Sequence, residues 1–163
     1  MIEQMEENRA RDEARAQLNS IKKMILRIEH IEECKSTDGY CNMEDVDLLD
    51  GLDEYDNGQD QEEMFNRYHN ETEALNAIDE SPLGIQLRSG WHNVGEEPTD
   101  DEFEILLCTG GPAVKIRGEL DSHGRPDRAW LEYQDWGIQW TFYTDFNNGD
   151  MDDVLKFAQH LIF

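Results

Sequence analysis

The feature that most constrains the fold is a change at Pro82 in the spacing of the apolar residues. Before Pro82 they recur every three or four residues, the period of an α-helix, and after it they alternate with other residues, the period of a β-strand. Helices kept apart from strands along a chain favour an α+β fold, because a parallel α/β sheet needs the two to alternate. We therefore expect an antiparallel sheet after Pro82, flanked by helices.

Residues 1–35 are predicted to form one helical arm. No glycine or proline occurs before Gly39, and good helix formers fill the positions between the apolar residues. The apolar residues form one stripe on such a helix: Ala14, Leu18, Ile21, Ile25 and Ile28. The stripe spans about two heptads, short of a coiled coil, so we expect it to pack on the protein's own body. The alternatives are a homodimer seam and a groove for a partner helix, so the chain is expected to be a monomer or a homodimer.

Residues 36–81 predict an acidic loop followed by a second helix. Glycines punctuate the first part, where at most one short helix is expected. The second helix is expected to run from Gln61 to Ile78 and to end before Pro82, because the residue before a proline avoids helical dihedral angles. Its inward face is predicted to consist of Met64, Tyr68, Leu75 and Ile78.

Tight turns separate about four expected strands after Pro82. The strands are expected at residues 83–89, 103–108, 113–120 and 128–136. Short connections rich in glycine indicate an antiparallel meander, and in the turn Thr109–Pro112 at least one glycine is expected at positive φ. Ile138–Tyr143 is a candidate extension of the fourth strand. A closing helix is expected from Met151 to His160, with an inward face of Val154, Leu155, Phe157 and Ala158.

The chain is strongly acidic, with 14 Lys and Arg against 38 Asp and Glu and a formal charge of −24. The charge is uneven: the helical arm 1–35 carries −1, the acidic loop and helix 36–81 carry −14, and the α+β body 82–163 carries −9. We expect one compact domain, with the arm packed on the body. Direct binding to nucleic acid or to an anionic membrane is not expected, since both depend on Lys and Arg.

No segment is apolar over the roughly 18 residues that a membrane span requires. The N-terminal residues have neither a basic start nor an apolar stretch, so no secretion signal is expected. Three cysteines, an odd number, cannot form a complete set of disulfides. These features favour a cytoplasmic protein.

The stretch Glu102–Trp140 resembles a family of small acidic proteins encoded by tailed phages and prophages. The turn Cys108–Ala113 and the strand Leu131–Trp136 carry the resemblance, which extends over about 82–163. It departs at Gly137–Trp140, where the family pattern has a proline before the tryptophan. The family has no established reaction, so the resemblance implies no catalytic residue. It implies a mobile element inside a bacterial host cell, where such small proteins often act against host immunity.

Short motifs that resemble metal sites are incomplete. Asp53–Gly58 begins like a calcium-binding loop, but Tyr55 fills the third position and Met64 the twelfth, where carboxylates are needed. A cluster of His30, Cys34 and Cys41 is imaginable as half of a zinc site, but no second half follows it in the sequence. We therefore expect no metal and no cofactor.

No catalytic motif assembles in the sequence. Cys108 follows two leucines and is interpreted as a small core residue, although a glycine-rich turn comes directly after it. The turn itself lacks the lysine and the following helix of a phosphate-binding loop. Glu132 and Asp135 lie close on one strand, but nothing distinguishes them from the other acids. An enzyme is therefore the least supported of three functional classes.

The other two classes are binding proteins. Two acidic clusters are candidate partner-binding residues: Asp45, Asp47, Asp50, Asp53, Glu54 and Asp56, followed by Glu96, Glu97, Asp100 and Asp101. They favour an inhibitor of a host defence complex, of the anti-CRISPR or antirestriction type, that imitates DNA and occupies a basic surface of a protein or ribonucleoprotein. The alternative is a binding module without mimicry that uses an aromatic face, for which Trp136 and Trp140 are the candidates. Salt should weaken the first kind of contact much more than the second.

Overall fold

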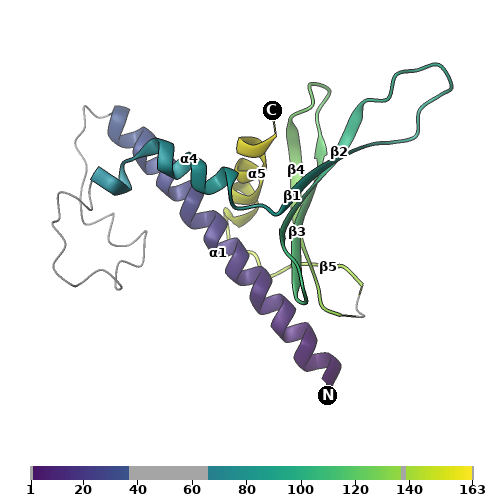
Figure 1. Cartoon of the computed structure of the whole chain (residues 1–163), viewed down its shortest axis with the longest axis horizontal. Coiled ribbons are helices and arrows are strands. Elements are labelled where there is room, and N and C mark those ends of the chain that lie inside the picture. The colour runs from purple at the N-terminus through teal and green to yellow at the C-terminus, as the bar shows by residue number, and fades with distance from the viewer. Residues whose placement is uncertain (1, 37–65, 137–138, 163) are drawn as a thin grey trace.

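The computed structural model describes residues 2–36, 66–136 and 139–162, and for residues 2–8 only the backbone. The helices are α1 (Ile2–Ser36), α4 (Glu71–Asp79) and α5 (Asp150–Leu161). The strands are β1 (Gly84–Ser89), β2 (Asp100–Cys108), β3 (Ala113–Leu120), β4 (Pro126–Gln134) and β5 (Thr141–Phe142). They form one antiparallel sheet in the order β1-β2-β3-β4-β5, so the predicted α+β class is confirmed (Figure 1).

The core lies between one face of the sheet and helices α1 and α5 (Figure 1). The apolar stripe of α1 is buried along its described length: Ala10, Ala14, Leu18, Ile21, Ile25, Ile28 and Ile31. The strands contribute alternate residues, namely Phe103, Ile105, Leu107, Val114, Ile116, Ala129, Leu131 and Tyr133. From α5, Val154, Phe157 and Ala158 are buried, whereas Leu155 is only partly buried. The stripe of α1 therefore packs on the protein's own body, as the preferred interpretation expects.

Ion pairs also hold α1 to the acidic body. Its basic residues pair with acids from later elements: Arg9 with Asp135 at 3.1 Å, Arg15 with Asp145 at 3.3 Å, Lys22 with Asp150 at 2.6 Å, Arg27 with Glu73 at 4.0 Å and Lys35 with Glu71 at 2.5 Å. Exposed pairs contribute about 0–1 kcal/mol each, so the two that involve buried acids, Asp135 and Asp150, matter most. The bases of the arm thus neutralise acids of both later segments, 36–81 and 82–163.

Asp150, the first residue of α5, is buried and carries a charge that depends on Lys22. Burial alone would raise the pKa of its carboxyl group, but the contact with Lys22 and the hydrogen bond donated by the Asn147 backbone N–H, at 2.8 Å, outweigh it and lower the pKa. A carboxyl group whose pKa is lower in the folded state stabilises the fold above its unfolded pKa of about 3.9. This contribution is lost as the pH falls through the folded pKa.

Asp150→Asn is expected to lower the melting temperature by about 5 °C at pH 7, corresponding to about 1–2 kcal/mol. The amide keeps the acceptor for Asn147, so the loss reports on the charge. The gap to the wild type should begin to shrink as the pH falls below about 4, where the carboxyl group of the unfolded wild type is protonated, and should close as the pH passes the lower pKa of the folded state. Thermal melts of both proteins between pH 7 and pH 3 measure this, with the exposed Asp152→Asn as the control. A gap that stays constant would contradict the role of the charge.

The second helix is not continuous, so the prediction of one helix from Gln61 to Ile78 is wrong in this respect. Residues 66–68 are helical, but the chain turns at His69 and α4 begins at Glu71. The reason is local: the side chain of Asn70 accepts a hydrogen bond from the backbone N–H of Glu73 and caps a new helix. Tyr68 and Ile78 are buried, as predicted, and the restart also turns Ala74 inward. Leu75 is exposed, contrary to the predicted inward face. The expected residues before 66, including Met64, lie outside the described residues.

The strands start and end close to the predicted positions, with two corrections. Ile138–Tyr143 does not extend the fourth strand: Thr141 and Phe142 form β5, which returns along β4 and pairs with Glu132 and Tyr133. The fourth strand ends at Gln134. The turn after β2 is as predicted, since Gly110 and Gly111 have φ of 113° and 74°.

The edge strand β1 is exposed on both faces although its sequence alternates. Helix α1 contacts β3 and β4, α5 contacts β4, and β1 lies beyond them at the edge of the sheet. Leu83, Ile85 and Leu87 therefore lie on the helix-covered side of the sheet but remain 62%, 40% and 48% exposed. Alternation shows which side chains share a face of a strand, but whether another element covers that face is decided by the tertiary structure.

Candidate protein-binding surface

The hairpin that joins β1 to β2 projects beyond the rest of the sheet (Figure 1). Its loop, residues 90–99, contains Trp91 and Val94, both fully exposed. The four acids of the second predicted cluster, Glu96, Glu97, Asp100 and Asp101, lie in this loop or at the start of β2, and all are exposed. The hairpin therefore combines a large apolar side chain with several carboxylates. We call residues 90–101 the acidic hairpin.

Hydrogen bonds within the acidic hairpin hold two of these carboxylates in place. Asp101 accepts a hydrogen bond of 2.8 Å from the backbone N–H of Gly90, which closes the base of the loop. Glu96 accepts two, both of 3.1 Å, from the side chain and the backbone N–H of Asn93. These donors lower the pKa of Glu96, so it is charged at neutral pH. Two of the four acids of the hairpin are thus positioned by its own structure.

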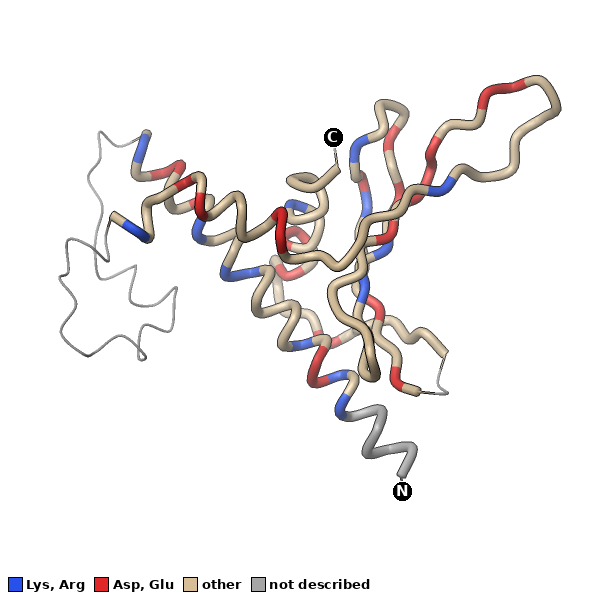
Figure 2. Tube along the Cα trace, in the orientation of Figure 1, with Lys and Arg blue, Asp and Glu red and all other residues tan. Residues whose placement is uncertain are grey.

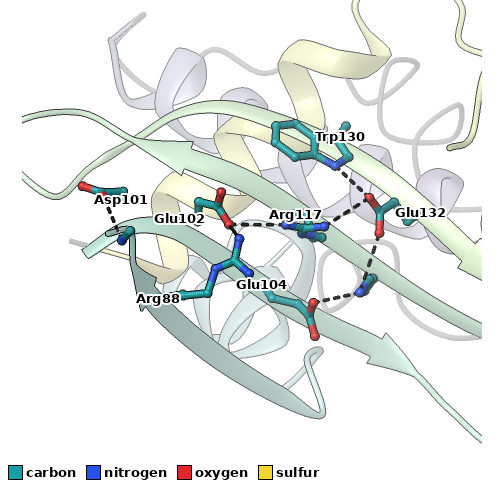
Figure 3. A network of polar contacts seen from close by, with 9 residues as sticks. Arg88, Asp101, Glu102, Glu104, Arg117, Trp130 and Glu132 are labelled. Atoms are coloured by element: carbon teal, nitrogen blue, oxygen red, sulfur yellow. Dashed lines mark hydrogen bonds and ion pairs between the residues drawn. The ribbon is translucent and has the colours of Figure 1, made fainter. Parts of the chain in front are cut away.

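The open face of the sheet is also charged, but its charges neutralise one another (Figure 3). Glu102 pairs with Arg88 and with Arg117, the latter at 3.3 Å. Lys115 donates a hydrogen bond of 2.8 Å to Glu104 and lies 3.6 Å from the buried Glu132. The indole N–H of Trp130 donates to the second oxygen of Glu132 at 3.0 Å. Three acids and three bases make up this network, so its net charge is zero.

The distribution of charge along the chain makes the acidic hairpin distinct. Figure 2 shows acidic positions on the projecting loop and at the start of β2, whereas acidic and basic positions are mixed along the inner strands and α1. Because the open sheet face is neutral and α1 pairs its bases with body acids, the carboxylates of the hairpin present negative charge away from these networks. Residues 90–101 contain four exposed carboxylates and no Lys or Arg.

The first predicted acidic cluster cannot be compared with it. Asp45, Asp47, Asp50, Asp53, Glu54 and Asp56 lie outside the described residues. Their role in binding a partner stays a prediction.

The aromatic pair does not lie next to the acidic hairpin. In this meander the β1–β2 hairpin lies at one end of the sheet, and the β2–β3 turn lies at the other (Figure 1). Trp136 is 74% exposed and its indole N–H donates to the carbonyl of Gly110 in that second turn, at 3.3 Å. Trp140 is half-buried, and its ring lies over the ammonium group of Lys115 at 4.0 Å. The predicted acidic and aromatic candidates therefore occupy opposite ends of the sheet.

The sequence prediction did not select Trp91, although this residue is fully exposed in the acidic hairpin. A tryptophan in a loop rich in polar residues and glycine was the available signal, because a loop of this length offers nothing to bury it.

The predicted core residue Cys108 packs against the core. Burial raises the pKa of its thiol, so the group is a neutral thiol at pH 7 and a poor nucleophile.

Among the described residues, one group of three side chains brings together atoms that bind metals well: His30, Cys34 and His69. The sequence prediction placed the first two in an incomplete cluster with Cys41. His69 is contributed by the turn before α4, and Cys41 lies outside the described residues.

Comparison with protein-family models finds no match, and comparisons with curated proteins and with solved structures find no significant match either. The resemblance to phage proteins therefore stays a prediction. None of the described helices combines the length and the apolar composition needed to cross a membrane.

Proposed function

We propose that the protein is an acidic inhibitor that binds a basic, nucleic-acid-binding surface of a host defence complex and competes there with DNA. The observation that carries this proposal is the acidic hairpin, with exposed carboxylates and a fully exposed tryptophan on an element that projects from the fold. The phage context, and with it an anti-CRISPR or antirestriction role, comes from the sequence resemblance alone.

Charge and shape support this kind of partner. A protein with a formal charge of −24 is attracted to basic surfaces over distances of about one Debye length, roughly 8–10 Å at physiological salt. Carboxylates at the rim of such a contact guide association, while a buried tryptophan at its centre supplies much of the affinity. Because Glu96 and Asp101 are held by hydrogen bonds, their charges need no rearrangement on binding.

The test begins with capture of the partner from a bacterial lysate and is decided by competition. The captured partner is loaded with labelled DNA and titrated with the full chain at about 50 mM and at about 200 mM salt. Release of the DNA, with an apparent affinity that falls steeply at the higher salt, is expected. If DNA stays bound while the chain binds elsewhere on the same partner, mimicry is wrong.

A variant with four neutral hairpin residues tests the surface itself: Glu96→Gln, Glu97→Gln, Asp100→Asn and Asp101→Asn. The amides keep the acceptors for Gly90 and Asn93, so the loop is expected to keep its shape. We expect binding to weaken about tenfold or more, because steered association is lost. The melting temperature should stay level or rise, since self-repulsion falls.

The matched control removes the same charge elsewhere: Glu32→Gln, Asp79→Asn, Glu80→Gln and Asp152→Asn, all exposed and located on helices or, for Glu80, at the C-cap of α4. Its affinity for the partner should remain within about twofold of that of the wild type, because exposed charges outside the contact contribute little to binding. Equal losses in both variants would show that overall charge, and not the acidic hairpin, drives binding.

The second candidate function is a binding module without mimicry, and the full exposure of Trp91 and Val94 favours it. In that case Trp91→Ala should remove most of the affinity, about 2 kcal/mol or more, with little dependence on salt. Trp136→Ala, at the opposite end of the sheet, is the control for the aromatic pair predicted from sequence. A loss with Trp136→Ala alone would assign the binding face to the β2–β3 end instead.

A further inference from the structure

We propose that His30, Cys34 and His69 form a zinc-binding site that ties the C-terminal end of α1 to the turn before α4. One ligand atom from each side chain, a ring nitrogen from each histidine and the sulfur of Cys34, can be chosen so that all three lie within 4.8 Å of one another. The elements that contribute them lie side by side (Figure 1). This proposal is independent of the acidic hairpin and of the function proposed for it.

The distances are close to those that a zinc ion imposes. With Zn–S of about 2.3 Å and Zn–N of about 2.0–2.1 Å in tetrahedral geometry, sulfur and nitrogen ligands lie roughly 3.5 Å apart and two nitrogens roughly 3.3 Å apart. The Nε2 atom of His30 is 3.4 Å from the sulfur of Cys34. The ring centroids of His30 and His69 are 5.4 Å apart. All three ligand atoms lie within 4.8 Å of one another, so zinc binding requires the third ligand to move closer by roughly 1 Å.

The backbone presents the three side chains from two fixed segments. His30 and Cys34 are four residues apart on α1, so they lie one turn apart on the same face of the helix. The guanidinium group of Arg27 donates hydrogen bonds to the carbonyls of Arg67, at 2.8 Å, and of Tyr68, at 3.0 Å. On the other side of His69, Asn70 caps α4. Hydrogen bonds thus fix the backbone on both sides of His69, and those from Arg27 hold it against α1.

The donor set favours zinc over the cations that bind acidic proteins without specificity. One thiolate and two imidazoles suit Zn²⁺, whereas Ca²⁺ and Mg²⁺ prefer oxygen ligands. Cys34 is buried and both histidines are half-buried, which protects such a site from competing water. Reactive cysteines are usually partly exposed, whereas Cys34 is buried. Its burial therefore favours metal binding over nucleophilic chemistry. Three protein ligands leave one position for water or another ligand.

The experiment uses the full chain, stripped of metal with a chelator and titrated with zinc alone in the presence of excess calcium and magnesium. We expect one zinc per chain, and a melting temperature about 5–10 °C higher when free zinc exceeds the dissociation constant about 100-fold. Cobalt in place of zinc should give a thiolate-to-metal charge-transfer band in the near ultraviolet.

Matched variants locate the site. Cys34→Ser and His69→Ala should weaken zinc binding at least about 100-fold, since losing even an outer hydrogen-bond partner of a ligand costs about 10- to 100-fold. Cys34→His should still bind cobalt but without the charge-transfer band. Cys108→Ser and His92→Ala change the same residue types elsewhere and should keep both zinc and band, with circular dichroism confirming that each variant is folded. No zinc in the wild type, or equal zinc binding by Cys34→Ser, His69→Ala and the controls, would overturn the proposal.

Discussion

Leu18→Glu is expected to lower the melting temperature by more than about 10 °C. Leu18 is buried within the stripe of α1 that packs on the sheet and α5. Leucine and glutamate have similar helix propensities, so the loss comes from burial and not from the helix. Losing a buried leucine and placing a charge in its site together cost about 4 kcal/mol or more, a large share of the 5–15 kcal/mol of an ordinary domain.

The neighbouring Asn19→Glu, at an exposed position of the same helix, is the control and should melt within a few degrees of the wild type. Light scattering coupled to size exclusion measures the mass of each protein in solution. Because the stripe is buried against the chain's own sheet, the mass of folded Leu18→Glu should equal that of the wild type. A wild-type dimer that this substitution halves would instead support the homodimer seam.

Gly118→Ala is expected to destabilise the fold by about 3 kcal/mol, or about 10 °C in melting temperature. Gly118 lies in β3 between its partners Phe103 on β2 and Ala129 on β4. A Cβ atom there would lie 2.1 Å from the backbone carbonyl oxygen of Arg128 and 2.3 Å from the ring of Phe103. Since the ring is buried and the carbonyl is part of β4, neither can move without disturbing the centre of the sheet.

Gly84→Ala is the matched control, because Gly84 also lies in a strand but a Cβ atom there would meet nothing within 4 Å. Its melting temperature should stay close to that of the wild type. Thermal and urea denaturation followed by circular dichroism compare the two variants directly. If Gly118→Ala melts as Gly84→Ala does, the close packing of Phe103 against β3 is not present in solution.

The candidate binding surface was predictable only in part from the sequence. The acids Glu96, Glu97, Asp100 and Asp101 were identified as a cluster because they are close in sequence, and one hairpin indeed carries them. Trp136 and Trp140 are the candidates for the alternative, an aromatic binding face, because they flank Gly137 near an expected loop. The meander separates the two groups to opposite ends of the sheet, because successive turns in an antiparallel sheet alternate between its ends.

What the sequence by itself determined is local. The spacing of Leu18, Ile21 and Ile25 fixes one apolar face whenever α1 is helical, and the alternation in 103–108 and 113–120 does the same for strands. Glycine at 110 and 111 allows the positive φ that the turn requires. These features depend on neighbours within a few residues, so pattern and propensity are enough to predict them.

Only the tertiary structure decided which distant residues meet. It left the apolar side of β1 uncovered, returned β5 along β4, and neutralised Glu102 with Arg88 and Arg117. It also brought His69 close to His30 and Cys34, although His69 lies 35 residues after the cysteine in the chain. Such contacts depend on how α1 lies across the sheet and on where Asn70 restarts a helix. The free energy of burial that fixes these arrangements is shared by the whole core, and no short stretch of sequence contains it.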